Sequence, residues 1–391
     1  MPGFETIGDE EFAELKSIFE NGGVLFRQGF EPLRNGVYKV REFEDRFAAA
    51  MQAPNALAVS SGTAALRVAL AALGIGAGDE VIAPSFTFVA TVEAIVESAA
   101  TPVCCDVDRT LNMAPEALEK AITPETKAVI VVHMLGTPAR LREIKAICDR
   151  HDLFLIEDTA WGCGGNIDGK PLGTWGDVGT FSFDFAKTLT TGEGGMVICR
   201  DRDVHERAAA WHDHGHENNP MVPRWEDTRA SSGFNFRMTE MQGAIGLAQI
   251  KKLSSIVERQ RRNASLLWSA LEYIEGIEPR DCPAGGYETA DALTFFVPSK
   301  DIALKCREAL IENGFGTKIL PEAVTWHFAA TWNHITQLKA RHNHDLAGAF
   351  VETQKLLECA VCLPISINMP DEQPAKITSI IASVLNPYGA R

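Results

Sequence analysis

Lys187 is a candidate nucleophile because its neighbours in the sequence are apolar. It lies in GTFSFDFAKTLTTGEGG, residues 179–195, close to Phe185, Ala186 and Leu189. Burial lowers the pKa of an amine because the charged form loses its hydration, and a neutral amine can form a Schiff base with a carbonyl compound. A single lysine in such a setting more often extends its ammonium group to the surface. The assignment therefore needs support from other parts of the chain.

A second candidate is the turn Ser60-Ser61-Gly62-Thr63, which precedes a helical pattern. The N–H groups at a helix start attract anions, glycine lets the backbone approach a ligand, and hydroxyls donate hydrogen bonds. The same four residues can also be a simple helix cap. The turn therefore indicates either a phosphate site or a cap.

Two acids, Glu157 and Asp158, end the apolar run LFLIED. An acid at this position either caps the next helix or contacts a ligand beyond the strand. An aspartate that faces a pyridine nitrogen keeps that nitrogen protonated and strengthens an electron sink. Both roles are open from position alone.

The loop SSGFNFRMTEMQ places Asn235 and Arg237 between apolar side chains. Polar residues in such a setting favour a buried or interfacial loop. They can serve either the structure or a ligand.

Strand and helix patterns alternate around these residues. They lie at residues 63–73 (helix), 80–83 (strand), 101–108 (strand), 127–134 (strand), 139–152 (helix) and 153–158 (strand). The continuous run KAVIVVHM is typical of a strand that is covered on both faces. The alternation predicts an α/β fold with a mostly parallel central sheet flanked by helices, which binds ligands beyond the carboxyl ends of its strands.

The C-terminal part of the chain has a different pattern. Residues 240–271 contain neither Gly nor Pro after Gly246, which predicts a long helix that links two domains. A strand at DALTFFVPS and helices at DIALKCREALIENG and EQPAKITSIIASVLN follow it. We therefore expect a large α/β domain over residues 1–250 and a smaller α+β domain over residues 251–391.

Composition narrows the classes of partner. The 391 residues carry a formal net charge of -15, and the sequence has no basic run. Such a chain repels nucleic acid and anionic membrane surfaces, so we expect neither as a partner. No apolar run is long enough to cross a bilayer, and the acidic start MPGFETIGDEEFAELK is not a secretory signal. Nine cysteines in apolar stretches fit free thiols in the cytoplasm. Cys359 and Cys362 have no second pair nearby, so we expect buried thiols there and no metal site.

Taken together and in order, four segments resemble the DegT/DnrJ/EryC1/StrS sugar aminotransferases, a branch of the fold-type I pyridoxal-phosphate (PLP) enzymes. The segments are SSGTAALRVALAALGIGAGDEVIAPSFTFVAT, VHMLGTPARLREIKAICDRHDLFLIEDTAWGCGG, GDVGTFSFDFAKTLTTGEGG and GFNFRMTEMQGAIGLAQIKKL. The resemblance runs from about residue 20 to the carboxyl end. MPGF, FRQGF and DHGHEN further resemble the subset that makes 8-amino-3,8-dideoxy-manno-octulosonate.

The resemblance implies pyridoxal 5'-phosphate as cofactor and a role for each candidate residue. Lys187 is implied to bind the cofactor through its amine and to move the substrate proton. Asp158 is implied to pair with the pyridine nitrogen, and Phe88 to stack on the ring unless it is a plain core aromatic. The cofactor phosphate is implied to lie among Gly62, Thr63, Ser182 and, from a neighbouring subunit, Asn235. That last contact implies a homodimer with shared active sites.

Trp161 departs from the family pattern. The family usually has Gln or His three residues after the aspartate, hydrogen-bonded to the phenolic oxygen of the cofactor. An indole N–H can donate but cannot accept a hydrogen bond. Trp161 therefore donates to that oxygen, fills space that other members leave for substrate, or packs aside.

Four further residues are candidate substrate contacts: Arg27, His214, Arg237 and His327. Each can instead be a salt-bridge, packing or solvated loop residue.

The resemblance implies transfer of an amino group from glutamate, or glutamine, to a keto- or aldehydo-sugar such as an 8-oxo octulosonate. A nucleotide-sugar aminotransferase is the alternative. A PLP-dependent sugar dehydratase is less favoured because dehydratase relatives replace the lysine. A non-catalytic regulatory homologue is disfavoured because Lys187, Asp158 and Ser182 are all present.

Overall fold

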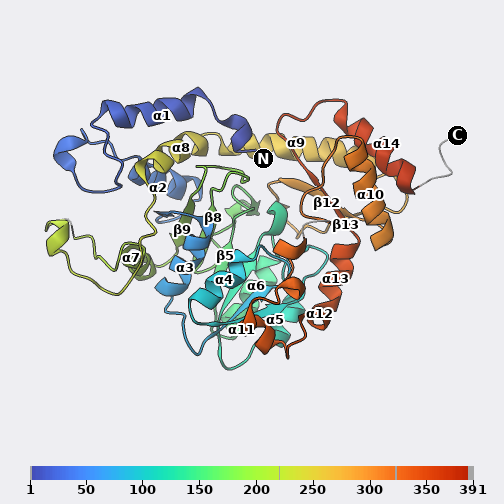
Figure 1. Ribbon diagram of the computed structural model, residues 1–391, viewed down its shortest axis with the longest axis horizontal. Coiled ribbons are helices and arrows are strands. Elements are labelled where there is room, and N and C mark those ends of the chain that lie inside the picture. Colours follow the sequence, from blue (N-terminus) through green and yellow to red (C-terminus); the bar gives the residue numbers. More distant parts are fainter. Residues whose placement is uncertain (1, 220, 322–323, 386–391) are drawn as a thin grey trace.

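The computed structural model describes residues 2–219, 221–321 and 324–385. Its centre is a seven-stranded sheet with the strand order β1-β9-β8-β5-β4-β2-β3 (Figure 1). These strands span Leu57–Val59 (β1), Glu80–Pro84 (β2), Thr101–Cys105 (β3), Thr126–Val132 (β4), Phe154–Asp158 (β5), Val178–Ser182 (β8) and Gly195–Cys199 (β9). The pairings from β3 to β8 are parallel, and β9 is antiparallel to both of its neighbours. The predicted mostly parallel α/β sheet is confirmed.

Helices cover both faces of this sheet. They span Lys39–Ala50 (α2), Gly62–Ala72 (α3), Ala90–Glu97 (α4), Pro115–Ala121 (α5), Leu141–Arg150 (α6) and Arg202–Trp211 (α7). Strand β4 shows why both faces are covered, because side chains alternate along a strand. Ala128 and Ile130 share a core with α3 and α4, whereas Val129 and Val131 share one with α5 and α6.

The predicted long helix is two helices in line, α8 (Glu240–Ile250) and α9 (Leu253–Leu271) (Figure 1). The prediction of one continuous helix was therefore wrong at residues 251–252. There the N–H of Lys252 donates to the carbonyl of Gln249, three residues back, at 2.9 Å. This bond is of the 3-10 type, and it interrupts the α-helical pattern in which each N–H donates to the carbonyl four residues back. An N-terminal helix, α1 (Asp9–Glu20), packs along α8.

The C-terminal region contains a small antiparallel sheet with its own core, as expected for a smaller α+β unit. Its elements are Glu278–Pro279 (β10), Ala292–Phe296 (β12), Ala360–Pro364 (β13), Lys300–Glu312 (α10) and Gln373–Leu385 (α14). Apolar residues of α9, α10 and α14 pack on β12 and β13. A third sheet joins Asn166–Ile167 (β6) and Lys170–Pro171 (β7) to Gly286–Tyr287 (β11).

Between α10 and β13 the chain returns to the large sheet. This stretch contains Thr336–Arg341 (α11), Leu346–Ala349 (α12) and Val351–Glu358 (α13). Phe328, Trp332 and Phe350 belong to the same core as α3 and α4, and α11 packs beside β3. The domain boundary at residues 250 and 251 stays a prediction.

Short 3-10 helices occupy several connections: Phe4–Thr6 (η1), Glu31–Leu33 (η2), Met134–Gly136 (η3), Arg224–Glu226 (η4), Val324–Trp326 (η5) and Ala329–Thr331 (η6). Within the described ranges, no helix is both long and apolar enough to cross a membrane.

Candidate active site

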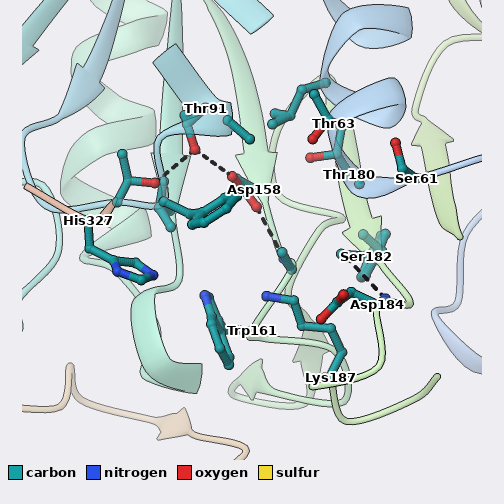
Figure 2. A pocket seen from close by; sticks show the side chains of 18 of the residues that line it. Ser61, Thr63, Thr91, Asp158, Trp161, Thr180, Ser182, Asp184, Lys187 and His327 are labelled. Carbon is teal, nitrogen blue, oxygen red and sulfur yellow. Dashed lines mark hydrogen bonds between the residues drawn. The ribbon is translucent and has the colours of Figure 1, made fainter. Parts of the chain in front are cut away.

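A pocket of about 300 Å³ opens at the carboxyl edge of the central sheet. Asp158 ends β5 and Ser182 ends β8, and the ends of these parallel neighbours meet at one edge. Lys187 lies in the loop between β8 and β9, while Gly62 begins α3 just after β1. Figure 2 shows Asp158, Ser182 and Lys187 around this pocket, which all four residues line. Four candidates far apart in the sequence are therefore brought together.

Hydrogen bonds hold Asp158 in one orientation. Thr91 Oγ1 donates to Asp158 Oδ2 at 2.9 Å, and the N–H of Ala160 donates to Oδ1 at 3.2 Å. Thr91 Oγ1 also lies 2.8 Å from Thr87 Oγ1. Burial raises the pKa of the Asp158 carboxyl, although the hydrogen bonds from Ala160 and Thr91 oppose the rise. A buried, oriented carboxylate is suited to pairing with a cationic ring nitrogen.

The amine of Lys187 lies over the indole ring of Trp161, 3.4 Å from the ring centroid. Part of the Lys187 side chain is open to the pocket, but protein surrounds the amine, and burial lowers its pKa to about 8. The charges of Asp158 and Asp291 oppose this change, whereas the charge of Lys318 adds to it. A substantial fraction of this amine is neutral at slightly alkaline pH, so it can act as a nucleophile and as a base. Lys187 is thus not a lysine that extends into solvent.

The turn before α3 is a cap, and it also borders the pocket. Ser61 Oγ accepts a hydrogen bond from the N–H of Ala64 at 3.0 Å, while Ser61, Gly62 and Thr63 line the cavity. A Cβ on Gly62 would lie 2.7 Å from Ser182 Cβ and 3.0 Å from Ser182 Oγ. Glycine is therefore needed here for space. The start of α3 and the hydroxyls of Ser61, Thr63 and Ser182 could hold a phosphate.

Phe88 and His327 form another wall of the pocket. The ring centroid of Phe88 lies 5.4 Å from that of His327 and 6.1 Å from that of Trp326. His327 is buried there, and its backbone carbonyl accepts a hydrogen bond from the N–H of Thr87 at 2.9 Å. Phe88 is 38% exposed, so it is not a plain core aromatic.

Arg27 and Arg237 do not line this pocket. Arg27 Nη2 donates to both carboxylate oxygens of Glu44, at 2.8 and 3.1 Å. Arg237 Nη1 donates to Asp213, which Arg224 also binds at 2.6 Å. Burial opposes ionisation of Asp213, but the hydrogen bond and charge of Arg224 hold its pKa well below the usual range. Both predicted substrate arginines are thus engaged in ion pairs within this chain.

Asn235 and His214 also lie outside the pocket, both of them exposed. Backbone contacts join their loops: Asp213 forms a β-bridge with Asn235, and the N–H of His214 donates to the carbonyl of Phe234 at 3.1 Å. Within one chain, these residues contact neither Lys187 nor Asp158.

Several residues at the site have no distinctive sequence signal. Thr91, Asp184 and Glu193 line the pocket. Lys318 lies 4.5 Å from the ring centroid of Trp161 and forms an ion pair with the buried carboxylate of Asp291. Lys318 and Asp291 come from the C-terminal region, where no motif marks either one. Among the described residues, no cluster of His, Cys, Asp or Glu could hold a metal ion.

The fold and the pocket together define a fold-type I PLP aminotransferase. The chain superposes on the crystal structure of the aminotransferase TlmJ from Streptoalloteichus hindustanus with a TM-score of 0.84 and 27% sequence identity. The superposition covers 98% of this chain and 97% of that chain. Residues 30–382 match the DegT/DnrJ/EryC1/StrS aminotransferase family, and the chain belongs to this family.

Two curated relatives illustrate the range of the match. One is the GDP-perosamine synthase of Escherichia coli O157:H7, 40% identical over 228 residues, 58% of this chain and 61% of the relative. The other is a UDP-N-acetyl-3-dehydro-alpha-D-glucosamine 3-aminotransferase of Acidithiobacillus ferrooxidans. It is 34% identical over 389 residues, 98% of this chain and 96% of the relative. The predicted class, a PLP-dependent sugar aminotransferase, and the predicted cofactor are confirmed.

The residues at the pocket fit this cofactor. An amine at Lys187 suits its aldehyde, the buried acid Asp158 suits its pyridine nitrogen, and the hydroxyl-rich start of α3 suits its phosphate. The three groups border one cavity (Figure 2).

Proposed function

We propose that the protein transfers an amino group from glutamate, or glutamine, to the keto group of a nucleotide-linked sugar. The observation that carries the proposal is the convergence of Lys187, Asp158 and the Ser61–Thr63 turn on one pocket. The amino donor and the sugar acceptor would use the same pocket one after the other, because the donor's product leaves before the acceptor binds. Ping-pong kinetics are therefore expected.

Lys187 is the residue proposed to bind the cofactor and to move the proton. With a pKa of about 8, its amine can accept a proton from the substrate carbon and return it within one turnover. Asp158 would keep the pyridine nitrogen of the bound cofactor protonated, and the hydrogen bond from Thr91 holds the carboxylate in position. Bound PLP supplies an electron sink for the bond that breaks. Trp161, directly beneath the amine, excludes water from it and limits its positions.

A nucleotide-linked acceptor is favoured over the octulosonate by the two relatives, whose names include GDP-perosamine and a UDP-linked glucosamine derivative. Arg27 and Arg237, the predicted partners of an acceptor anion, are already paired with Glu44 and Asp213, which weighs equally against a sugar carboxylate and a nucleotide diphosphate at these residues. His327 is the predicted substrate residue that lines the pocket, and we propose that it contacts the acceptor.

We propose a homodimer in which Asn235 of one subunit reaches the cofactor phosphate of the other. Large apolar side chains are exposed on the loops around Asn235 and on the neighbouring loop near residue 30: Phe30 (55%), Trp225 (84%) and Phe234 (57%). Phe30 packs on Phe26, which in turn contacts the guanidinium groups of Arg224 and Arg237, so these two loops are contiguous. Exposed apolar groups of this kind favour a protein–protein interface.

Mixed oligomers test the shared site. Lys187→Ala and Asn235→Asp should each be inactive, the first for lack of the amine and the second because a carboxylate repels the phosphate. Subunits of the two variants, mixed and reassembled, should regain part of the activity because one of the two sites is then intact. No regain in oligomers shown to contain both variants would contradict the shared site.

The cytoplasm is proposed as the compartment. All nine cysteines are free thiols, an arrangement that suits a reducing environment.

A substrate panel tests the reaction itself. The loaded protein should absorb visible light, and L-glutamate should bleach that band. Keto-sugars linked to GDP or UDP, an inosose and an 8-oxo octulosonate are then supplied, and mass spectrometry detects the aminated product. Amination of a nucleotide-linked sugar supports the proposal, whereas amination of the octulosonate alone would overturn it. Lys187→Ala should lose turnover, and the matched Lys251→Ala, which removes an exposed lysine, should keep it.

A further inference from the structure

The first described residues of the chain pack against the loop that carries Lys187. The N–H of Gly3 donates to the carbonyl of Lys187 at 3.2 Å. The ring of Phe4 lies on the ring of Phe185, with 4.6 Å between their centroids. Residues 2–6, which we call the N-terminal clip, thus contact the active-site loop through both backbone and side chain.

Gly3 fits this contact because it has no side chain. A Cβ at this position would lie 2.9 Å from Lys187 O, 2.9 Å from Thr190 N and 3.0 Å from Thr188 O. These are backbone atoms, so they cannot turn aside as a flexible side chain could. Gly3 has φ -60°, which any residue adopts, so glycine is required by the close approach alone.

A buried glutamine at the end of α8 holds the clip and the loop together. Gln249 Nε2 donates to Thr6 Oγ1 at 3.1 Å, and Gln249 Oε1 accepts from the N–H of Thr190 at 3.4 Å. Lys252 Nζ adds a hydrogen bond to the carbonyl of Thr6 at 2.7 Å. Gln249 is fully buried, so water does not compete for these bonds.

The clip also contacts the C-terminal region. The Glu5 carboxylate accepts hydrogen bonds from Ser366 Oγ at 2.6 Å and from the N–H of Ile367 at 3.1 Å. Ile367 and Leu189 belong to the same buried cluster. Three parts of the chain therefore meet at the clip: the lysine loop, the end of α8 and the segment after β13.

We propose that the N-terminal clip is a positioning element for the reaction, which fixes the backbone of Lys187 so that its amine points into the pocket. Gly3 sets the distance between the clip and the backbone of Lys187. The hydrogen bonds of Glu5 connect the clip to the C-terminal region. The clip touches neither substrate nor reacting atoms and acts through Lys187. The inference rests on the role of Lys187 in the proposed function.

The test compares Gly3→Ala with Gly8→Ala, which adds the same methyl group five residues later, where nothing lies within 4 Å of the new Cβ. Gly3→Ala should push the clip off the loop and lower kcat about 10- to 10²-fold, because small displacements of a catalytic group cost that much, with KM for the donor nearly unchanged. Gly8→Ala should stay within about twofold of the parent rate.

Hydrogen–deuterium exchange gives a second readout that needs no turnover. Amides of residues 183–191 should exchange faster in Gly3→Ala than in Gly8→Ala, with or without cofactor. Phe4→Ala, which removes the ring contact without any steric push, should change exchange in the same direction by less. If the parent protein transfers no amino group, the proposed function fails while exchange still tests the clip. Equal exchange rates and equal kcat values in Gly3→Ala and Gly8→Ala would overturn the proposal that the N-terminal clip positions Lys187.

Discussion

The amine of Lys187 lies 3.4 Å from the ring centroid of Trp161, and Lys318 lies 4.5 Å from the same centroid. An aromatic face attracts a cation, so the ring stabilises the protonated amine while burial destabilises it. Trp161 therefore sits where it can influence the charge of the residue that carries the chemistry.

Replacing Trp161 with Leu should lower the pKa of Lys187 below about 8, because the attraction between ring and ammonium is lost. The pH dependence of the rate at which the lysine of cofactor-free protein reacts with an acylating reagent measures this pKa. In Trp161→Phe, which keeps an aromatic face, the pKa of Lys187 should lie between its values in the parent protein and in Trp161→Leu. A pKa that rises towards 10.5 in Trp161→Leu would instead show that the indole chiefly excludes water.

The lowered pKa of Lys187 should also affect stability. The folded pKa is about 8 and the ordinary value is 10.5, so between these pH values the unfolded chain binds more protons. The free energy of unfolding of cofactor-free protein should therefore rise with pH across this window, relative to Lys187→Met, which cannot titrate. Urea unfolding of both proteins at several pH values measures the difference. A difference that stays constant from pH 8 to 10.5 would show that the amine is not buried.

Asp158→Asn keeps the shape of the side chain but removes its charge. We expect kcat to fall by about 10²-fold or more, as for other positioned ionisable groups, because the ring nitrogen loses its anionic partner. Thr91→Val should cause a smaller loss, since it removes the hydrogen bond to Asp158, worth about 1 kcal/mol, along with the bond to Thr87, but leaves the carboxylate in place. Asp152→Asn, on the surface, is the control. Single-turnover rates with L-glutamate measure the effect, and unchanged rates in Asp158→Asn would remove Asp158 from its role.

Gly62→Ala should weaken cofactor binding, because the new Cβ would lie 2.7 Å from Ser182 Cβ. Overpacking of this kind costs about 1–3 kcal/mol, so the Kd for PLP should rise about tenfold or more. Gly76→Ala is the matched control, since its nearest contact would be an ordinary 3.6 Å. Fluorescence titration of cofactor-free protein measures both affinities. Equal affinities would indicate that the phosphate binds elsewhere.

The pattern of apolar runs predicted the sheet, whereas the resemblance to a known family supplied the cofactor and the role of the lysine. Strands β2, β4 and β5 follow from short apolar runs, and residues at the ends of parallel strands must share one edge. The family resemblance implied that Gly62, Asp158, Ser182 and Lys187 form one cofactor site, and a shared strand edge agrees with that assignment.

Only the tertiary structure decided which charged residues are free to bind a substrate and which groups surround Lys187. Arg27 and Arg237 looked equally suited to a substrate anion, but folding pairs them with Glu44 and Asp213. The contact of Gly3 with Lys187 joins residues 184 positions apart, and the Lys318–Asp291 ion pair comes from a region without a motif. Local periodicity reports which face of an element is buried, whereas these partners depend on how distant segments pack, and no local pattern records that.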